Sequence, residues 1–463
     1  MVVAIVLVTW LVSVLPAEGG GAAPRPPDVL FHEFVSEGDV PVDWDVGPRS
    51  LHVGVGSGFR VRFDPEELTL DFVTGSVVER NPLPSLCMAA LRDADGRLCV
   101  ALLGTVPGRP YARIAAGRWG ESLPLVESEC DTSFVGSHLD RDGGLLVLTL
   151  VGEREFEDVL AAPASRFGEP PPSRYRLTRI DREGTVSWST ELPRAAGGNG
   201  RIVTGANGTI VVALECDAES FEPTFDLASG VTKDAWGRTG SLGVIRLRED
   251  GHVLSMTRVD GRALGGCRNS LEEFGRVGNA LAVDGDGSIF LVGATTSASF
   301  EASSGAFMES LGAPSVRYGF VTKLTPDASR IEFATLLGGA GGIFPGTTCT
   351  GVDVDSAGRV HVVGWTDASD FPTTPDALRR EPPDSDNLID DGFLAVLDRT
   401  GSRLLFATRV GDTNTDDTTH RVDVADHGVV TLLGTSWMGP YSDYERSTET
   451  GTWVMRLRLD LDE

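Results

Sequence analysis

Short apolar runs separated by polar turns fill most of the chain, and one order of runs appears twice in its middle. In residues 280–339, an apolar run, a turn ending in Gly287 and a second apolar run precede a polar stretch and two more apolar runs. Residues 351–411 repeat this order around Gly358, which lies 71 residues after Gly287. A fixed period of this kind indicates a repeat architecture.

The same order can be followed beyond the central pair. The first two runs of the unit recur around anchor glycines that lie about 66 residues apart on average: Gly96, Gly143, Gly208, Gly287, Gly358 and Gly428. The last two runs recur at residues 175–192 and 243–259. Gly is abundant, with 56 residues among 463, and helical periodicity is weak, so the chain is predicted to be all-β. Each unit is predicted to form four antiparallel strands.

The apolar runs do not alternate cleanly with polar residues, which is typical of strands covered on both faces. Radial packing of four-stranded sheets buries both faces and leaves only short edges, as in a β-propeller. About seven blades are predicted, with six as the alternative, in one domain over residues 29–463. Residues 453–461 supply a third strand and the chain then ends. An N-terminal segment, either 28–36 or 68–74, is therefore predicted to pair with them and close the ring.

The central copies resemble the bacterial secreted β-propeller repeat family known as SBBP. The similar residues are 282–297, 319–329 and 333–339 in one copy, and 352–375 and 401–411 in the next. The string DFPTTP, residues 370–375, is the most specific part. The resemblance implies a propeller repeat of exported and cell-surface proteins, and it implies no established catalytic residues.

The N-terminus carries an uncharged apolar run at residues 2–15, which is short for a membrane span and suits a signal-peptide core. No Lys or Arg precedes the run, which departs from the usual signal-peptide pattern. We expect residues 1–23 to be a signal peptide and residues 24–28 a linker. The mature chain is then expected to be secreted, periplasmic or at the cell surface, with no membrane span.

The formal net charge of −27 argues against nucleic acid or an anionic membrane surface as a partner. The six cysteines are scattered with no C-x-x-C pair, which argues against a zinc site. Cys216 and Cys267 flank one unit, and they are the pair that we expect a disulfide to join if one forms after export.

Acidic turns raise the question of calcium. Asp93 and Asp95, like Asp140 with Asp142 and Asp284 with Asp286, precede an anchor glycine. A full calcium loop needs further ligands and a bidentate Glu, which these turns lack. We therefore expect hairpin turns in which Asp caps the backbone and Gly adopts positive φ, with no cofactor. Calcium binding is the alternative.

Long connections between the second and third strands are predicted to share one face, where loops on a rigid scaffold usually bind ligands. The connection after Trp365 is rich in Asp and Glu and is predicted to be a solvated acidic loop, with a site for cations or a basic partner as the alternative. Aromatic residues on this face suit a glycan or peptide, although packing at the strand ends is the simpler interpretation. The candidate ligand-binding residues are Trp365, Asp367, Asp370, Trp437 and Tyr441.

Catalytic motifs are absent from the sequence, including the nucleophile elbow and the H-E-x-x-H zinc motif. His361 is predicted to be packed in the core, while His420 and His427 flank one inner strand. We therefore predict an exported, monomeric scaffold that binds an extracellular protein or glycan. One alternative is a polysaccharide hydrolase or lyase with paired carboxylates in the central channel. Another is a calcium-stabilised adhesion module.

Overall fold

The computed structural model is all-β. It describes residues 26–37, 40–46, 50–57, 63–71, 77–82, 87–92, 95, 97–105, 112–127, 132–152, 173–218, 221–228, 232–233, 239–259, 279–297, 300–310, 312, 316–341, 346–382, 390–411, 415–425, 428–437 and 451–461. These residues contain no helix, and thus none that could cross a membrane.

Two four-stranded antiparallel sheets form the N-terminal part of the fold. The first consists of β2 (Val40–Val46), β3 (Ser50–Ser57), β4 (Phe63–Asp71) and β5 (Val77–Pro82). The second consists of β6 (Cys87–Arg92), β7 (Leu98–Thr105), β8 (Ala112–Arg118) and β9 (Leu125–Glu127).

A nine-stranded sheet follows, and it contains two units joined by one long strand. It comprises β10 (Thr132–Leu139), β11 (Leu145–Gly152), β12 (Ser173–Ile180), β13 (Val186–Thr204), β14 (Ile210–Asp217), β15 (Phe225–Asp226), β16 (Thr232–Lys233), β17 (Thr239–Leu247) and β18 (Val253–Val259). The first part of β13, through Arg194, pairs with β12, and the part from Ala195 pairs with β14. The strand β13 therefore serves as the last strand of one unit and the first strand of the next.

Three four-stranded sheets form the C-terminal part. They are β19 (Leu281–Val283), β20 (Ile289–Thr295), β21 (Tyr318–Leu324) and β22 (Ile331–Leu337); β23 (Thr347–Val354), β24 (Val360–Thr366), β25 (Asp391–Leu397) and β26 (Leu404–Val410); and β27 (Asp416–Ala425), β28 (Val429–Trp437) and β29 (Gly451–Arg458) with β1 (Asp28–Glu37).

The N-terminal strand completes the last of these sheets. β1 runs antiparallel to β29, with Asp28 opposite Arg458 and Glu37 opposite Gly451. The predicted pairing of residues 28–36 with the C-terminal strand is therefore confirmed. The alternative segment, 68–74, was wrong, because Leu68 lies in β4 and pairs with both β3 and β5.

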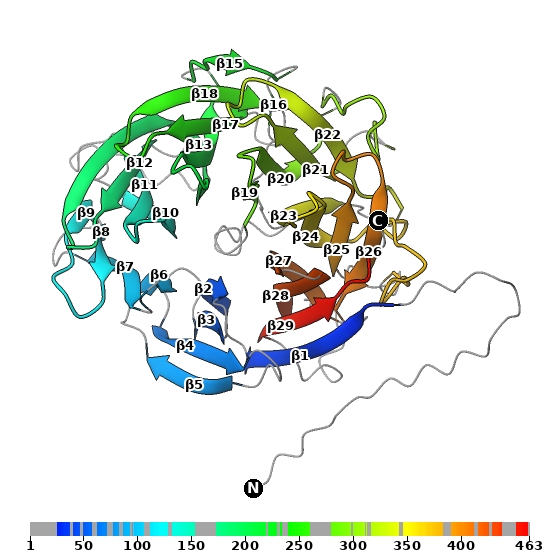
Figure 1. Ribbon diagram of the computed structural model, residues 1–463, viewed down its shortest axis with the longest axis horizontal. Helices are drawn as coiled ribbons and strands as arrows, with labels where there is room; N and C mark the ends of the chain where they lie inside the picture. The colour runs from blue at the N-terminus through cyan, green and yellow to red at the C-terminus, as the bar shows by residue number, and fades with distance from the viewer. Residues whose placement is uncertain are drawn as a thin grey trace, which may run out of the picture.

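The sheets are arranged radially, and in the last of them β27 lies nearest the centre while β1 lies on the outside (Figure 1). Successive inner strands contact one another in the order β2, β6, β10, β13, β19, β23 and β27, and β2 also contacts β29. Every residue of β20, β24 and β25 is buried. These strands are covered on both faces, which explains why their sequences do not alternate.

The described hairpin turns around Gly287 and Gly358 have the predicted geometry. The carboxylate Oδ1 of Asp284 accepts the backbone N–H groups of Asp286 and Ser288 at 3.0 and 2.8 Å. Gly287 closes this turn with a φ of 88°, and Gly358 has a φ of 78° at the equivalent place. Positive φ is unfavourable for residues that carry a Cβ, which explains the glycine at each described anchor position.

The turn between the third and fourth strands packs on the preceding sheet. Thr257 Oγ1 in β18 donates to the carbonyl of Ala328 at 2.8 Å, so the 325–328 turn rests on the sheet before it. Gly401 occupies the corresponding place one sheet later, with a φ of 68°, and a Cβ there would lie 2.4 Å from Phe333 in β22. The turns therefore join neighbouring sheets.

Replacing Gly401 with Ala tests this junction. Positive φ costs Ala about 1–2 kcal/mol, and overpacking against Phe333 adds about 1–3 kcal/mol. The matched control is Gly305→Ala, because Gly305 has a φ of 81° and nothing within 4 Å of an added Cβ. Denaturant unfolding is expected to show a distinctly larger loss for Gly401→Ala, and equal losses would contradict the junction.

Candidate functional site

The long connections after the second strand fold back onto the outer strand of their own sheet. In sheet β23–β26, the N–H of Thr374 donates to the carbonyl of Ala407 at 3.0 Å, and the N–H of Ala407 donates to Thr374 Oγ1 at 3.0 Å. In sheet β19–β22, Ser303 and Ala334 form the same pair of bonds at 2.8 and 2.9 Å. We call each such segment, residues 300–308 and 371–379, a latch.

A third latch lies in the nine-stranded sheet. The N–H of Thr224 donates to the carbonyl of Met256, and the N–H of Met256 donates to Thr224 Oγ1 at 3.1 Å. The latch continues as β15, which pairs in parallel with the outer strand β18. The three latches cover the edges of β18, β22 and β26, which would otherwise present unpaired backbone groups.

Each latch begins with a buried phenylalanine. Phe371 lies 4.7 Å from Phe393, and Phe300 lies 5.6 Å from Phe320, between ring centroids. Phe221 is also buried. Each aromatic residue comes 13 positions after an anchor glycine, and Phe156 and Tyr441 have the same spacing in the sequence. This spacing was not recognised in the sequence. It explains the string DFPTTP, in which Phe371 is the core aromatic residue and Thr374 carries the hydroxyl that bonds to the outer strand.

The candidate residues Asp367 and Asp370 support the connection between two sheets. Asp367 Oδ1 accepts the N–H of Gly346 at 2.5 Å, and Asp370 Oδ1 accepts the N–H of Gly341 at 2.7 Å. Both carboxylates thus hold ends of the glycine-rich connection from β22 to β23. The contacts described for these two carboxylates are hydrogen bonds from backbone N–H groups, which have a structural role.

The three aromatic candidates have different surroundings. Trp365 is only 2% exposed, and the Arg317 guanidinium lies 5.4 Å from the centroid of its ring. Its burial is what the packing interpretation expects. Trp437 ends β28, where its side chain is outside the description, and Tyr441 lies outside the described residues.

Two histidines, His361 in β24 and His420 in β27, are packed in the interior. His361 is fully buried and lies 3.3 Å from Asp355 through Nε2 and Oδ2, as predicted for a core residue. His420 contacts Thr435 Oγ1 at 2.8 Å, and burial lowers its pKa to about 3. His427 lies outside the described residues.

The acidic turns use their first carboxylate to close the hairpin. Asp140 Oδ1 accepts the N–H groups of Asp142 and Gly144 at 2.9 and 2.8 Å, as Asp284 does in its own turn. Asp93 lies outside the described residues. Within the described ranges, no group of three or more His, Cys, Asp or Glu residues is placed to hold a metal ion.

The expected disulfide between Cys216 and Cys267 stays a prediction. Cys216 is a free, buried thiol, while Cys267 lies outside the described residues. The Sγ of Cys216 fills the space beside Gly243, where an added Cβ would approach it to 2.9 Å. Burial raises the pKa of this thiol well above its ordinary value. Cys216 therefore points into the sheet interior and acts as a small core residue.

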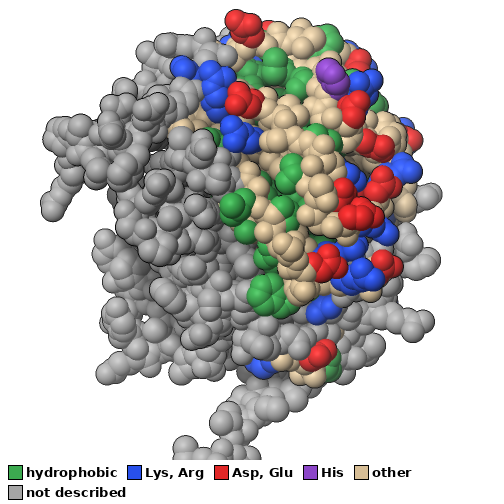
Figure 2. Space-filling model, turned by 90° about the vertical axis from the view of Figure 1, so that its left-hand side faces the viewer, with side chains coloured by type: hydrophobic (Ala, Val, Ile, Leu, Met, Phe, Trp, Pro, Cys, Tyr) green, Lys and Arg blue, Asp and Glu red, His purple; other side chains and the backbone are tan. Residues whose placement is uncertain are grey.

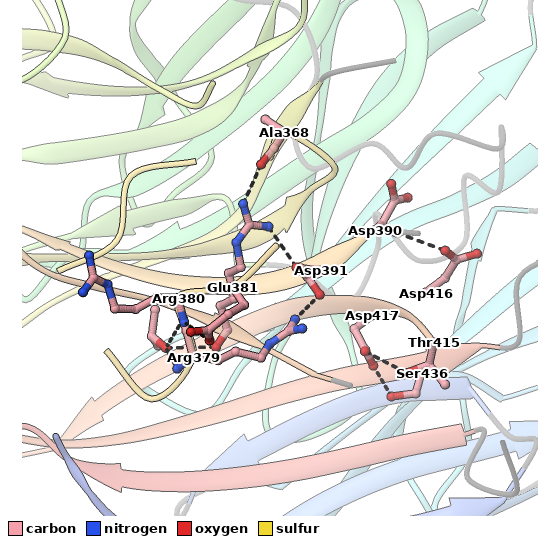
Figure 3. Close-up of polar contacts among 12 residues, drawn as sticks. Ala368, Arg379, Arg380, Glu381, Asp390, Asp391, Thr415, Asp416, Asp417 and Ser436 are labelled. Atoms are coloured by element: carbon pink, nitrogen blue, oxygen red, sulfur yellow. Dashed lines mark hydrogen bonds and ion pairs between the residues drawn. The ribbon is translucent and has the colours of Figure 1, made fainter. Parts of the chain in front are cut away.

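An ion triad lies beneath the acidic connection. Asp391 is fully buried between two guanidinium groups, with Arg379 on Oδ1 and Arg409 on Oδ2 at 2.8 Å (Figure 3). Arg409 also donates to the carbonyl of Ala368 at 2.5 Å. Burial raises the pKa of Asp391, although both arginines act to lower it. The predicted solvated loop is thus anchored at its base by ion pairs.

The preceding sheet holds apolar residues at the same three repeat positions. Met308, Tyr318 and Leu336 correspond in the repeat to Arg379, Asp391 and Arg409. Tyr318 and Leu336 are buried, and Met308 packs against the core. The chain therefore contains an apolar version of its own ion triad.

We expect the triad to favour one packing arrangement of the chain more than it adds to the free energy of unfolding. The variant Arg379→Met/Asp391→Tyr/Arg409→Leu should unfold within about 1 kcal/mol of the parent or be more stable, because apolar packing replaces costly desolvation. Asp391→Asn alone should cost about 3–5 kcal/mol, because it leaves two buried guanidinium groups without a counter-charge. Denaturant titration measures both, and a triple variant as unstable as Asp391→Asn would contradict the expectation.

Polar side chains on the inner strands tie neighbouring sheets together. Asn279, just before β19, donates to the carbonyl of Val352 in β23 at 3.0 Å and of Val422 in β27 at 2.7 Å. Its Oδ1 accepts the N–H of Val422 at 3.2 Å. One side chain therefore bonds to the inner strands of the next two sheets. Gly351 leaves room for it, because an added Cβ would lie 2.4 Å from that oxygen.

Asp353 in β23 makes a second connection of this kind. Its Oδ2 accepts the N–H of Val424 in β27 at 2.7 Å, and its Oδ1 accepts the N–H of Val354 at 2.8 Å. Burial raises the pKa of Asp353 to about 7, and the nearby carboxylate of Asp423 raises it further. Arg421, which lies 3.2 Å from Asp423, acts in the opposite direction.

The raised pKa gives a pH dependence of defined sign. Asp353 ionises near pH 4 in the unfolded chain and near pH 7 in the folded chain, so its ionisation costs stability as pH rises between those values. Asp353→Asn removes this ionisation. The new side-chain NH2 group then faces one of the two backbone N–H donors, which costs stability by an amount that does not depend on pH. Its stability relative to the parent should therefore rise by about 1–3 kcal/mol from pH 5 to pH 8. A constant difference across that range would contradict the assigned pKa.

Comparison with known proteins defines the class. Residues 332–372 match the SBBP family model, described as a beta-propeller repeat, which confirms the resemblance found in the sequence. No curated protein matches the chain. The radial sheets and this repeat make the protein a β-propeller with at least one recognisable SBBP unit.

Several solved structures are similar to this chain at 9–11% sequence identity, with TM-scores of 0.34–0.45. The polysaccharide lyase Uly1 has 10% identity and a TM-score of 0.44, with 96% of this chain and 94% of that chain covered. BBS1N, solved in complex with ARL6DN, has 10% identity and a TM-score of 0.45, with 95% and 99% covered. A europium-containing methanol dehydrogenase has 10% identity and a TM-score of 0.40, with 92% and 93% covered.

Proposed function

We propose that the sheets form a closed ring of seven blades. The nine-stranded sheet supplies two blades because β13 changes partners along its length. The other sheets supply five, the last of them completed by β1. The contact of β2 with β29 brings the first complete blade beside the last and supports closure. The alternative of six blades would require the two halves of β13 to belong to one blade.

We propose that the protein is an exported scaffold that binds an extracellular protein or glycan through one face. The observation that carries this proposal is the set of three latches, which fix the base of the connections on that face by paired backbone bonds. The same connections differ in length and composition from blade to blade, as expected of binding loops on a rigid frame. Trp437 remains the proposed ligand-contacting aromatic, whereas the spacing of Tyr441 matches that of the buried aromatic in each latch. The monomer remains the proposed state.

The contacts of the inner strands support a scaffold more than an enzyme of the central channel. A glycosidase or lyase needs two carboxylates available to the substrate. Asp353 uses both oxygens to accept backbone N–H groups, and Asp423 faces Arg421 at 3.2 Å. In the described inner strands, these acids therefore have structural partners.

A binding array tests the proposal. The chain from residue 24 is screened against cell-surface glycans and secreted proteins, and binding isotherms follow for the ligands found. Trp437→Ala is expected to weaken binding at least tenfold, because aromatic side chains carry much of the energy at such sites. Trp119→Ala is the matched control, since Trp119 is 50% exposed on an outer-strand turn. Equal affinities for both variants, or no ligand on the array, would overturn the proposal.

A further inference from the structure

Asparagine is followed directly by glycine at two places in the chain, Asn199–Gly200 and Asn207–Gly208. In this dipeptide the backbone nitrogen of the glycine reaches the asparagine side chain easily, because glycine has no Cβ and the widest choice of φ and ψ. The two copies have different surroundings. Asn207 is exposed at the turn between β13 and β14, whereas Asn199 is half-buried within β13.

The side chain of Asn207 folds back over the next residue. Its Oδ1 accepts the backbone N–H of Thr209 at 3.0 Å. A bond to the nitrogen two residues later holds Cγ on the same side of the turn as the Gly208 nitrogen. The same bond polarises the side-chain carbonyl, as the donors of an oxyanion hole do. The Gly208 N–H donates to the carbonyl of Gly205 at 2.9 Å, and this bond has to open before the nitrogen can react.

The surroundings of Asn199 prevent the same approach. Its Nδ2 donates to Glu215 Oε1 at 3.2 Å, so the side chain is directed toward β14. Gly200 pairs with Leu214 in the extended part of β13, and an added Cβ there would lie 2.6 Å from Leu148. Close packing around this glycine leaves the strand no freedom to turn its nitrogen toward Asn199, so only unfolding of this region would bring the two together.

We propose that Asn207 is a site of spontaneous deamidation in the folded protein, with water as the only co-reactant. The Gly208 nitrogen attacks Cγ of Asn207, the new N–Cγ bond closes a succinimide ring, and the Cγ–Nδ2 bond breaks. Nδ2 takes the proton from the Gly208 nitrogen and leaves as ammonia. Water then opens the ring. Cleavage of the N–Cγ bond gives aspartate, and cleavage of the bond from that nitrogen to the main-chain carbonyl carbon gives isoaspartate.

The repeat shows that the aspartate product fits this turn. The equivalent positions of two other turns are occupied by Asp142 and Asp286. Their turns are closed by an aspartate two residues earlier, where this turn has Gly205, and a Cβ at Gly205 would lie 3.0 Å from Asn207 Oδ1. Asn207 therefore closes its own turn, and a carboxylate in its place can accept the same backbone N–H.

The reaction adds a negative charge to a hollow between two turns of one blade. The hollow, of about 380 Å³, is lined by Asn207 and by Arg248, Glu249 and Asp250 of the turn between β17 and β18. Arg248 lies 3.0 Å from Asp250 and supplies a positive charge there. Acidic and basic side chains also lie close together on the side of the ring that holds β9 and β12 (Figure 2). One more carboxylate is therefore compatible with the folded state, and it makes the formal charge one unit more negative than −27.

Peptide mapping by tandem mass spectrometry tests the site. The chain from residue 24 is kept folded at pH 8, a second sample is kept unfolded in urea at the same pH, and both are sampled over time. In urea the two asparagines are expected to convert at similar rates, because each is followed by glycine. In the folded chain Asn207 should convert about 2–13-fold more slowly than in urea, because one hydrogen bond has to open. Asn199 should remain intact over the same period.

Two variants locate the charge change. Isoelectric focusing of the folded parent is expected to show an acidic band that grows with time. Asn207→Gln should abolish this band, because the longer side chain places its carbonyl one bond farther along and disfavours ring closure. Asn199→Gln is the matched control and should leave the band unchanged, and the map of the parent decides the question if this variant does not fold. Equal conversion of the two asparagines in the folded chain would overturn the proposal, as would an intact Asn207 while the urea sample converts.

Discussion

The burial of both faces of each sheet is the constraint on which the structure depends. A four-stranded sheet with two apolar faces has to pack between two others, and β20, β24 and β25 are buried along their entire length. Polar contacts then fix the spacing and register of neighbours. Asn279 bonds to the inner strands of two further sheets, and the Thr257 hydroxyl donates to the carbonyl of Ala328 in a turn of the next sheet. The propeller is thus held together by packing and aligned by a few directional bonds.

The latches answer the second demand of this architecture, which is the protection of sheet edges. A buried phenylalanine fixes the start of each latch, and a hydroxyl group three residues later pairs with the outer strand. The same segment that protects the edge also supports the connection on the face proposed to bind a ligand. Edge protection and loop positioning therefore come from one short motif, which is why DFPTTP is the most specific string in the repeat.

The sequence predicted the features that repeat and missed those that depend on contacts between repeats. The unit of four strands, the positive φ at Gly287 and the partner of the last strand all follow from period and turn chemistry. The latch was not predicted, because the pairing of Thr374 with Ala407 joins positions that no local pattern connects. The candidate carboxylates Asp367 and Asp370 were selected for their charge, whereas their described partners are backbone N–H groups of another segment. Cys216 was placed beside Cys267 by sequence position alone, and its side chain lies inside the sheet.

Ring closure by β1 is the central claim, and removing that strand tests it most directly. Thermal unfolding is compared for the chain from residue 24 and for a variant that lacks residues 26–37. Without β1 the edge of β29 loses its partner, and a loss of several kcal/mol should lower the melting temperature of a chain this long by about 5 °C. A synthetic peptide of residues 26–37 should restore much of the loss by binding to that edge. An unchanged melting temperature in the shortened chain would contradict the closed ring.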